Sequence, residues 1–472
     1  MRKHVFAPER QLFRKRGHIM AKKDIYRIVD GLKDLCTEAC RTIWDHPELS
    51  GEEDFGSEYY SKLLRKAGFR LETNENVPHA FIAEWGSGHP VLAVLGEYDA
   101  LPGLSQKRSI SKKEELTPGG AGHGCGHNIL GAAAATAAIA LKEVMEKDGL
   151  EGTVRFYGCP EEELLCGKVR MISYNMFDGC DFAFSWHPMS VNMTFDSSYL
   201  ANASFRFSYK GISAHAGFAP QNGRSALDAM ELTNIGVQYL REHVIDGTRI
   251  HYTTDSCGYA PNIVHPEAKS WYYVRAPHMA DVKETMERVK KCAQGAAIMT
   301  ETQVKFELLS GCSEMLVNNA FSDLTYRNLL ELEPIEYTEE EFEFARKIQD
   351  TVALETCMRD RRAYDCDGSM FEGIAPRDQW TRTPMLASTD SGDVSQIMPM
   401  NLFTAAAWPV GVAPHTWQAT ACAGSSLGEK AALWAAKAIG AVGYDILTMP
   451  EEREKITAEF EARKSSNYVP MI

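Results

Sequence analysis

The chain has 472 residues, of which 44% are hydrophobic and 24% are charged. This length exceeds what one ordinary hydrophobic core serves, so two compact domains are expected. The formal net charge of -14 disfavours binding to nucleic acid or to an anionic membrane surface. A local basic pocket can still bind an anionic substrate, so the charge does not exclude one.

The N-terminal segment and the cysteines bear on where the protein works. Residues 1–22 are basic and lack the apolar core of a secretory signal, which predicts a flexible arm. No run of about 18 apolar residues is present, which argues against a membrane span. The twelve cysteines are scattered along the chain, and free thiols in a reducing cytoplasm are the simplest account of them.

Helical and strand patterns alternate between residues 23 and 199. Apolar residues recur at helical spacing or in short buried runs bounded by glycine and proline. The predicted elements are the helices Asp24–Trp44, Glu58–Ala67, Ala132–Lys147 and Lys168–Tyr174, and the strands Phe81–Trp85, Val91–Leu95, Gly152–Gly158 and Phe182–Trp186. This alternation predicts an α/β fold with a mostly parallel sheet and helices on both faces.

The pattern changes in residues 200–315. Strand, helix, strand, helix and strand are predicted at 204–210, 225–243, 270–276, 281–299 and 304–309. This block is typical of a small α+β domain, ferredoxin-like, inserted as a lid or dimerisation domain. The catalytic domain would then comprise residues 23–199 and 316–472 and would finish with a helix from Ser426 to Val442.

A glycine-rich segment, Gly122–Asn128, carries Cys125 and His127 just before the predicted helix that begins at Ala132. A sulfur and a nitrogen ligand on a tight loop offer a first-row metal two fixed contacts. The alternative is a tight turn in which the cysteine is a small buried group. The dense packing of Gly, Cys and His favours a metal site.

Further metal-ligating side chains follow other predicted strands. The acidic run Glu161–Glu163 comes directly after a strand, and one glutamate can bind metal while its neighbour acts as a general base. The alternative is a solvated acidic run. His187, His415 and Asp99 also follow apolar stretches. Strand ends meet at one edge of an open α/β sheet, so we expect these groups to converge.

Four further polar side chains have a place in the predicted pattern. His215 is flanked by small residues and is expected to be exposed. Arg275 follows a predicted strand and is either a clamp for a carboxylate or part of a surface ion pair. Asp390 and Asp393 either form a turn or support the site.

Taken together, these motifs resemble the dinuclear metallo-amidohydrolases, a superfamily that includes aminoacylases, glutamate carboxypeptidases and indoleacetyl-amino-acid hydrolases. The likeness extends over nearly the whole chain from about Lys23. It is carried by Cys125-Gly126-His127, Pro160-Glu161-Glu162-Glu163, Trp186-His187 and Pro414-His415. Stretches that look like the B-type group of p-aminobenzoyl-glutamate hydrolases are Gly96–Gly103, Gly122–Asn128, Trp271–Pro277 and Gly424–Ser426.

The resemblance implies two divalent metal ions per subunit, zinc or manganese, with cobalt or nickel also possible. The implied ligands are Cys125, His127, Glu163, His187 and His415. Glu162 would be the general base, and Asp99 would support a ligand. His215 would polarise the scissile carbonyl from the partner subunit, while Asn262 and Arg275 would contact the carboxylate side of the substrate.

The implied activity is hydrolysis of an amide bond to an amino acid, most specifically of p-aminobenzoyl-glutamate to p-aminobenzoate and glutamate. A broader N-acyl-amino-acid or dipeptide hydrolase is the alternative enzyme, and a binding homologue without catalysis is the alternative from another class. The expected partners are such a small molecule and a second subunit, either identical or related. One departure from the wider superfamily is Asn128, where many relatives carry aspartate.

Overall fold

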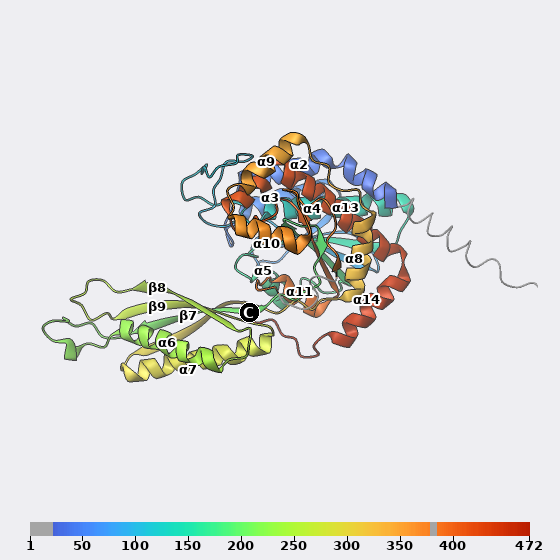
Figure 1. Ribbon diagram of the computed structural model, residues 1–472. Coiled ribbons are helices and arrows are strands. Elements are labelled where there is room, and N and C mark those ends of the chain that lie inside the picture. Colours follow the sequence, from blue (N-terminus) through green and yellow to red (C-terminus); the bar gives the residue numbers. More distant parts are fainter. Residues whose placement is uncertain (1–21, 378–384) are drawn as a thin grey trace, which may run out of the picture.

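The computed structural model describes residues 22–377 and 385–472. The predicted N-terminal arm therefore lies outside the described residues except for Lys22, which is buried and pairs with Asp445 at 2.8 Å. The described chain forms a large body and an elongated second body beside it (Figure 1). Each body has its own sheet and its own hydrophobic core.

The large body is built on a seven-stranded sheet in the order β1-β2-β4-β3-β5-β11-β6. Its central strands β4, β3, β5 and β11 run parallel, whereas β1, β2 and β6 pair antiparallel at the edges. The strands are β1 Arg70–Thr73, β2 Phe81–Ser87, β3 Val91–Glu97, β4 Gly152–Cys159, β5 Phe182–Met189, β6 Met193–Thr194 and β11 Met400–Ala406. The prediction of a mostly parallel α/β sheet is confirmed.

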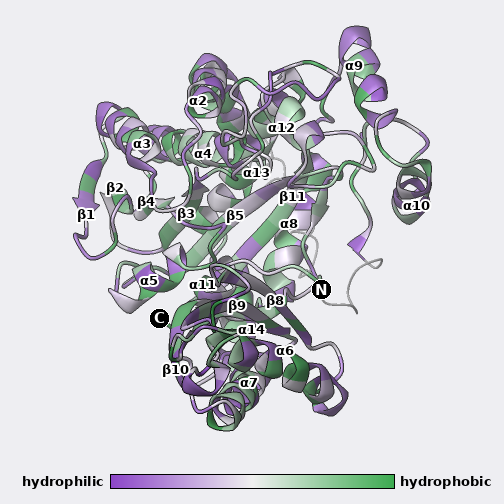
Figure 2. Cartoon of the chain, turned by 90° about the vertical axis from the view of Figure 1, so that its left-hand side faces the viewer, coloured by the Kyte–Doolittle hydropathy of each residue, from purple (hydrophilic) through white to green (hydrophobic). Residues whose placement is uncertain are grey.

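Helices lie on both sides of this sheet (Figure 2). Helices α2, α4 and α13 pack together on one side, where α4 contacts β3 and α13 contacts β11. Residues 22–31 are also helical. The named helices of the large body are α2 Lys33–Asp45, α3 Asp54–Lys66, α4 His127–Asp148, α5 Gly167–Ser173, α8 Asn319–Glu331, α9 Glu339–Gln349, α10 Leu354–Tyr364, α11 Ser391–Ile397, α12 Trp417–Ala423, α13 Ser426–Thr448 and α14 Pro450–Arg463.

Helix α4 is the central helix of the large body. Its alanine-rich sequence leaves no bulky side chain to keep it away from the sheet and from α2 and α13. It is long and apolar enough to cross a membrane, but 89% of its apolar window is buried within the protein, as expected for a core helix. It begins at His127, five residues earlier than predicted, so one candidate ligand belongs to its first turn.

The second body, which we call the lid, is the ferredoxin-like α+β unit that the sequence predicted. Its sheet has the order β10-β7-β9-β8, with all neighbours antiparallel. Its elements are β7 Ala201–Lys210, α6 Ala226–Leu240, β8 Arg249–Cys257, β9 Glu267–Ala276, α7 Met279–Met299 and β10 Gln303–Cys312, with short 3₁₀ turns at Pro220–Asn222 and Arg241–His243. The prediction missed β8, an edge strand with one buried side chain, Ile250, and no apolar alternation.

Candidate active site

The predicted convergence at one edge of the large sheet is present. Glu97 ends β3, the run Glu161–Glu163 follows β4, and His187 lies near the end of β5. His415 comes from the loop after β11, and His127 opens α4 beside them. The carboxyl ends of parallel strands thus gather side chains that are far apart in the sequence.

The glycine-rich loop holds its side chains by specific contacts. Gly126 has a left-handed backbone (φ 78°), and a Cβ there would lie 3.0 Å from Pro188, so glycine is required for both reasons. His123, which had no predicted role, is buried, and its Nε2 lies 3.0 Å from the carbonyl of Ile43. Asn128 donates from Nδ2 to the carbonyls of Cys40 and Ala423, each at 3.1 Å. His123 and Asn128 therefore anchor the loop and point away from the cluster.

One group of candidate ligands comprises Cys125, Glu163 and His415. A ligand atom from each lies within 4.8 Å of the others. The Nε2 of His415 is 3.3 Å from Oε2 of Glu163. The backbone N–H of His415 donates to the carbonyl of Gly124 at 2.8 Å, which ties this exposed loop to the glycine-rich loop. These three residues offer sulfur, oxygen and nitrogen to a single ion.

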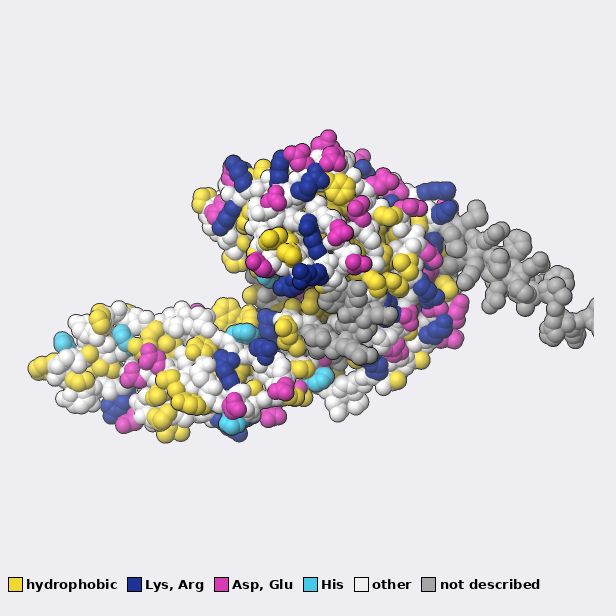
Figure 3. Space-filling view, viewed as in Figure 1, with side chains coloured by type: hydrophobic (Ala, Val, Ile, Leu, Met, Phe, Trp, Pro, Cys, Tyr) yellow, Lys and Arg dark blue, Asp and Glu magenta, His cyan; other side chains and the backbone are white. Residues whose placement is uncertain are grey.

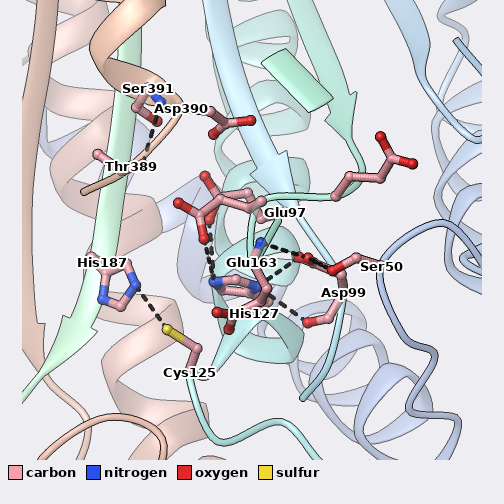
Figure 4. A network of polar contacts seen from close by, with 12 residues as sticks. Ser50, Glu97, Asp99, Cys125, His127, Glu163, His187, Thr389, Asp390 and Ser391 are labelled. Atoms are coloured by element: carbon pink, nitrogen blue, oxygen red, sulfur yellow. Dashed lines mark hydrogen bonds and ion pairs between the residues drawn. The ribbon is translucent and has the colours of Figure 1, made fainter. Parts of the chain in front are cut away.

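A second group comprises Cys125, His127 and His187, again within 4.8 Å of one another. The Sγ of Cys125 is 3.4 Å from Nε2 of His187, whose Nδ1 lies 2.8 Å from the carbonyl of Pro188. Nδ1 of His127 lies 2.8 Å from Oδ1 of Asp99 (Figure 4). In both histidines the outer nitrogen is held, so the other faces the cluster. Cys125 belongs to both groups, so its thiolate could serve as a ligand in either.

The hydrogen bonding and the pKa values of the candidate ligands also fit the binding of divalent cations. Nε2 of His127 and Oε1 of Glu163 are buried and have no hydrogen-bond partner, which is costly unless a ligand meets them. Burial raises the pKa of Glu163 to about 7 and that of the Cys125 thiol above its usual range. Burial lowers the pKa of His187 to about 4, which favours its neutral, ligating form. Bound cations would favour deprotonation of the carboxyl and the thiol.

The three consecutive glutamates have separate environments. Glu161 has a left-handed backbone (φ 56°) and turns away, and its carboxylate accepts a hydrogen bond from Arg170 at 2.7 Å. Glu163 joins the first ligand group. Glu162 is buried in the pocket wall, with Oε2 3.9 Å from Nε2 of His127. Burial, together with the nearby carboxylate of Glu97, raises the pKa of Glu162. A carboxylate in this position can exchange a proton with a water held in the cluster.

A cavity of about 410 Å³ opens over the two ligand groups. Its polar wall includes Arg275 and Tyr273 from β9 of the lid, together with Ser388 and Thr389. The Nε of Arg275 and the Oγ of Ser388 are buried without a hydrogen-bond partner. Apolar side chains that line the remainder are Leu165, Trp186, Met189, Met385 and Leu402. The cavity thus offers a cation for a carboxylate and apolar surface for a larger group.

His215 and Asn262, in contrast, lie together at the other end of the lid. The N–H of Ala216 donates to the carbonyl of Asn262 at 2.9 Å, and His215 is exposed as predicted. Arg275 pairs with the start of β7, whereas these two residues lie beyond Lys210, where β7 ends. Eight residues of strand separate the two ends by roughly 26 Å. The structure therefore does not bring His215 or Asn262 to the pocket of their own chain.

Glu97 and Lys168 were not predicted as site residues from the sequence. Both are buried, and Nζ of Lys168 lies 2.7 Å from Glu97 and 2.6 Å from Asp390. Of the two roles left open for Asp390, this ion pair favours support of the site. Asp393 accepts hydrogen bonds from Ser313 and lies outside the pocket. The available signal for Glu97 was its place at the end of a buried strand, two residues before Asp99.

Comparisons with known proteins agree with this architecture. Residues 201–299 match the family model described as a peptidase dimerisation domain. The chain is 40% identical to the B subunit of p-aminobenzoyl-glutamate hydrolase from Escherichia coli, over 90% of its own length and 92% of the relative. It is 26% identical to human Xaa-Arg dipeptidase over 90% and 88% of the two chains.

Among solved structures, the YXEP protein of Bacillus subtilis, described as a dinuclear metal binding peptidase from the M20 family, superposes with a TM-score of 0.57. The superposition covers 89% of this chain and 99% of that one, at 16% identity. At this identity the likeness concerns the fold: a parallel α/β body carrying an inserted four-stranded lid.

Proposed function

Because this chain belongs to the M20 family of metallo-hydrolases, we propose that it hydrolyses the amide bond of p-aminobenzoyl-glutamate to give p-aminobenzoate and glutamate. The observation that carries the proposal is the convergence of five candidate ligands and Glu162 beneath a cavity that also contains Arg275. The name of the 40% identical relative supports the choice of substrate.

We assign a dinuclear centre of two divalent ions, zinc or manganese, with cobalt or nickel also compatible with the donors. Cys125, Glu163 and His415 would hold one ion, and Cys125, His127 and His187 would hold the other. When bound, the ions would lower the pKa of a water and polarise the substrate carbonyl. Neither the ligands nor the candidate base is missing, which argues against a binding homologue without catalysis.

The chain's own residues supply the remaining steps. Glu162 would take the proton from the attacking water and deliver it to the leaving α-amino group of glutamate. Arg275 would pair with a carboxylate of the glutamate through its planar guanidinium. The apolar wall that includes Leu165 and Met189 would receive the aminobenzoyl ring.

A second subunit completes this proposal. His215 would stabilise the developing oxyanion, and Asn262 would contact the carboxylate side, each from the partner's lid. Support comes from the distance of both residues from their own pocket and from the match to a dimerisation domain. Hydrophobic side chains are exposed on the lid (Figure 3), among them Tyr239 and Ile298 at 75% and 79%. The partner would be an identical chain or a related subunit.

We also propose a cytoplasmic location. All twelve cysteines are free thiols, including the buried Cys125 that is assigned to the metals. A reducing compartment keeps such thiols available for metal binding.

A dipeptidase is the second candidate function, because the chain also resembles human Xaa-Arg dipeptidase over nearly its full length. The metal-loaded protein should therefore be assayed in parallel on p-aminobenzoyl-glutamate, on other N-acyl amino acids and on dipeptides with acidic or basic C-terminal residues. The highest kcat/KM is expected for p-aminobenzoyl-glutamate. If the protein instead prefers a dipeptide with a basic C-terminal residue, that dipeptide becomes the proposed substrate. The proposed metal-dependent hydrolysis would be unchanged.

A further inference from the structure

Glu97, at the end of β3, has two carboxylate oxygens in different environments. Oε1 accepts from Nζ of Lys168 at 2.7 Å, and that ammonium also pairs with Oδ1 of Asp390 at 2.6 Å. Asp390 accepts a further bond from the backbone N–H of Lys168 at 2.8 Å. The side chains of Lys168, Glu97 and Asp390 are 0%, 3% and 0% exposed. Three elements, β3, α5 and the start of α11, therefore hold this carboxylate in one orientation.

The second oxygen of Glu97 faces the candidate metal ligands. Oε2 lies 3.4 Å from Nε2 of His127, the buried nitrogen that has no hydrogen-bond partner. Figure 4 shows Glu97 directly over the His127 ring. Ligand atoms of Glu97, His127 and Glu162 lie within 4.8 Å of one another. Oε2 of Glu97 and Nε2 of His127 are therefore separated like two ligands of one ion, and they do not form a hydrogen bond.

With His127 neutral, as a metal-ligating histidine must be, the buried charges around Glu97 do not balance within the protein. Lys168 supplies one positive charge against the two buried carboxylates of Glu97 and Asp390, which leaves one negative charge in the interior. Glu162 lies close by and adds another when it is ionised. A buried charge without a partner is costly, and a divalent cation beside Oε2 would offset it.

We propose that Glu97 is a further protein ligand of the ion held by His127 and His187, and that Lys168 and Asp390 position it. This rests on the proposed dinuclear centre and extends its ligand set from five residues to six. Oε1 is held by the ammonium of Lys168, so Oε2 alone would bind the ion. Glu162 stays available as a base, because the ion that it faces would already have an oxygen ligand from Glu97.

The alternative is that Glu97 serves only as an ion-pair partner for the buried lysine. The two roles differ in metal binding. The test is titration of the chelator-treated full-length protein with Co²⁺, followed by calorimetry and by visible absorption, with bound metal counted after dialysis. The parent should bind two equivalents. Glu97→Gln, which keeps the shape and removes the charge, should bind one of them about 10–100-fold more weakly.

The absorption spectrum is a second measurement, because it would stay unchanged if Glu97 had only a structural role. In Glu97→Gln the visible bands of the weakened cobalt ion should change with its coordination, whereas the thiolate charge-transfer band from Cys125 should persist at the other ion. Asp393→Asn is the matched control, because Asp393 is 1% exposed, lies in the first turn of α11 and bonds to Ser313 and Tyr468 instead of the cluster. It should leave both affinities and the spectrum unchanged.

Unchanged affinity and spectrum in a folded Glu97→Gln protein would overturn the inference. If that variant does not fold, Glu97→Asp can be used, because it keeps the negative charge for Lys168 but withdraws the carboxylate from the cluster. It should still lower the affinity for one of the two ions. Parental affinity for both ions in Glu97→Asp would equally overturn the inference. A parent that binds fewer than two ions would remove the dinuclear centre together with this ligand. If the parent binds two ions and the variant binds one of them more weakly, but the parent does not hydrolyse p-aminobenzoyl-glutamate, Glu97 is supported as a ligand. Only the proposed substrate is then overturned.

Discussion

The candidate metal site and the lid differ in how much of their chemistry one chain can assemble. The metal-facing side chains come from five separate segments, yet the parallel sheet brings all of them to one edge. The lid carries Arg275 at the near end of its sheet and His215 with Asn262 at the far end. One chain therefore holds every proposed metal ligand but only part of the groups proposed to contact substrate.

This difference separates metal binding from catalysis. Metal binding should depend on a single folded chain, because each proposed ligand is in the large body. Turnover should depend on two lids, one that supplies Arg275 in the same chain and one that supplies His215 from the partner. Variants in the two regions should accordingly give different combinations of metal content, turnover and response to assembly.

The largest effect is expected from Glu162→Gln. Loss of the proposed base should lower kcat by about 10³-fold or more, because no other described carboxylate in the cavity wall is both buried and free of an assigned ligand or ion-pair role. The measurement is steady-state hydrolysis of p-aminobenzoyl-glutamate, with metal content determined on the same sample. Metal content should equal that of the parent. Near-parental turnover would show that Glu162 is not the base.

His215→Ala should lower kcat by about 10²- to 10³-fold while metal content stays at two ions. The sharper experiment mixes this variant with Glu162→Gln after dissociation and reassembly. Half of the dimers are then mixed, and each has one site with both groups intact, so about a quarter of the parental activity should return. If His215 acted in its own chain, no site would be intact and the mixture would stay inactive.

Arg275→Met should raise KM and lower kcat/KM by about 10- to 100-fold, since a charge-assisted bidentate pair with the substrate carboxylate is lost. Arg275→Lys should recover part of the loss through charge alone. The check is a substrate analogue in which the carboxylate is converted to an amide. The parent and Arg275→Met should hydrolyse that analogue equally slowly; a large remaining difference would assign Arg275 a different role.

Much of the fold was predictable because local patterns agreed with the final packing. The buried parallel strands read as short apolar runs, and α4 was recognisable from its alanines. The prediction failed where burial does not impose a pattern. Edge strand β8 is exposed along nearly its whole length, and its pairing with β9 comes from the chain that folds back beside it.

The site was predictable to the extent that its residues follow strands in the sequence. Cys125, Glu163 and His187 could be singled out in this way, and they do lie together. Lys168 could not, because a lysine at a helix start is usually solvated. Its burial depends on Glu97 and Asp390, which are 71 and 222 residues away in the chain and meet it only in the folded protein.

The smallest effect is expected from Asn128→Ala, which tests the glycine-rich loop Gly122–Asn128 itself. The Asn128 amide donates to two buried carbonyls, those of Cys40 and Ala423, so its loss should lower the free energy of unfolding by about 1–3 kcal/mol. Because the side chain points away from the ligands, metal content and kcat should stay near the parental values. Urea unfolding measures the first quantity, and Asn76→Ala, at an exposed asparagine, is the control that should not change it. A loss of metal without a loss of stability would instead place Asn128 among the groups that hold the ions.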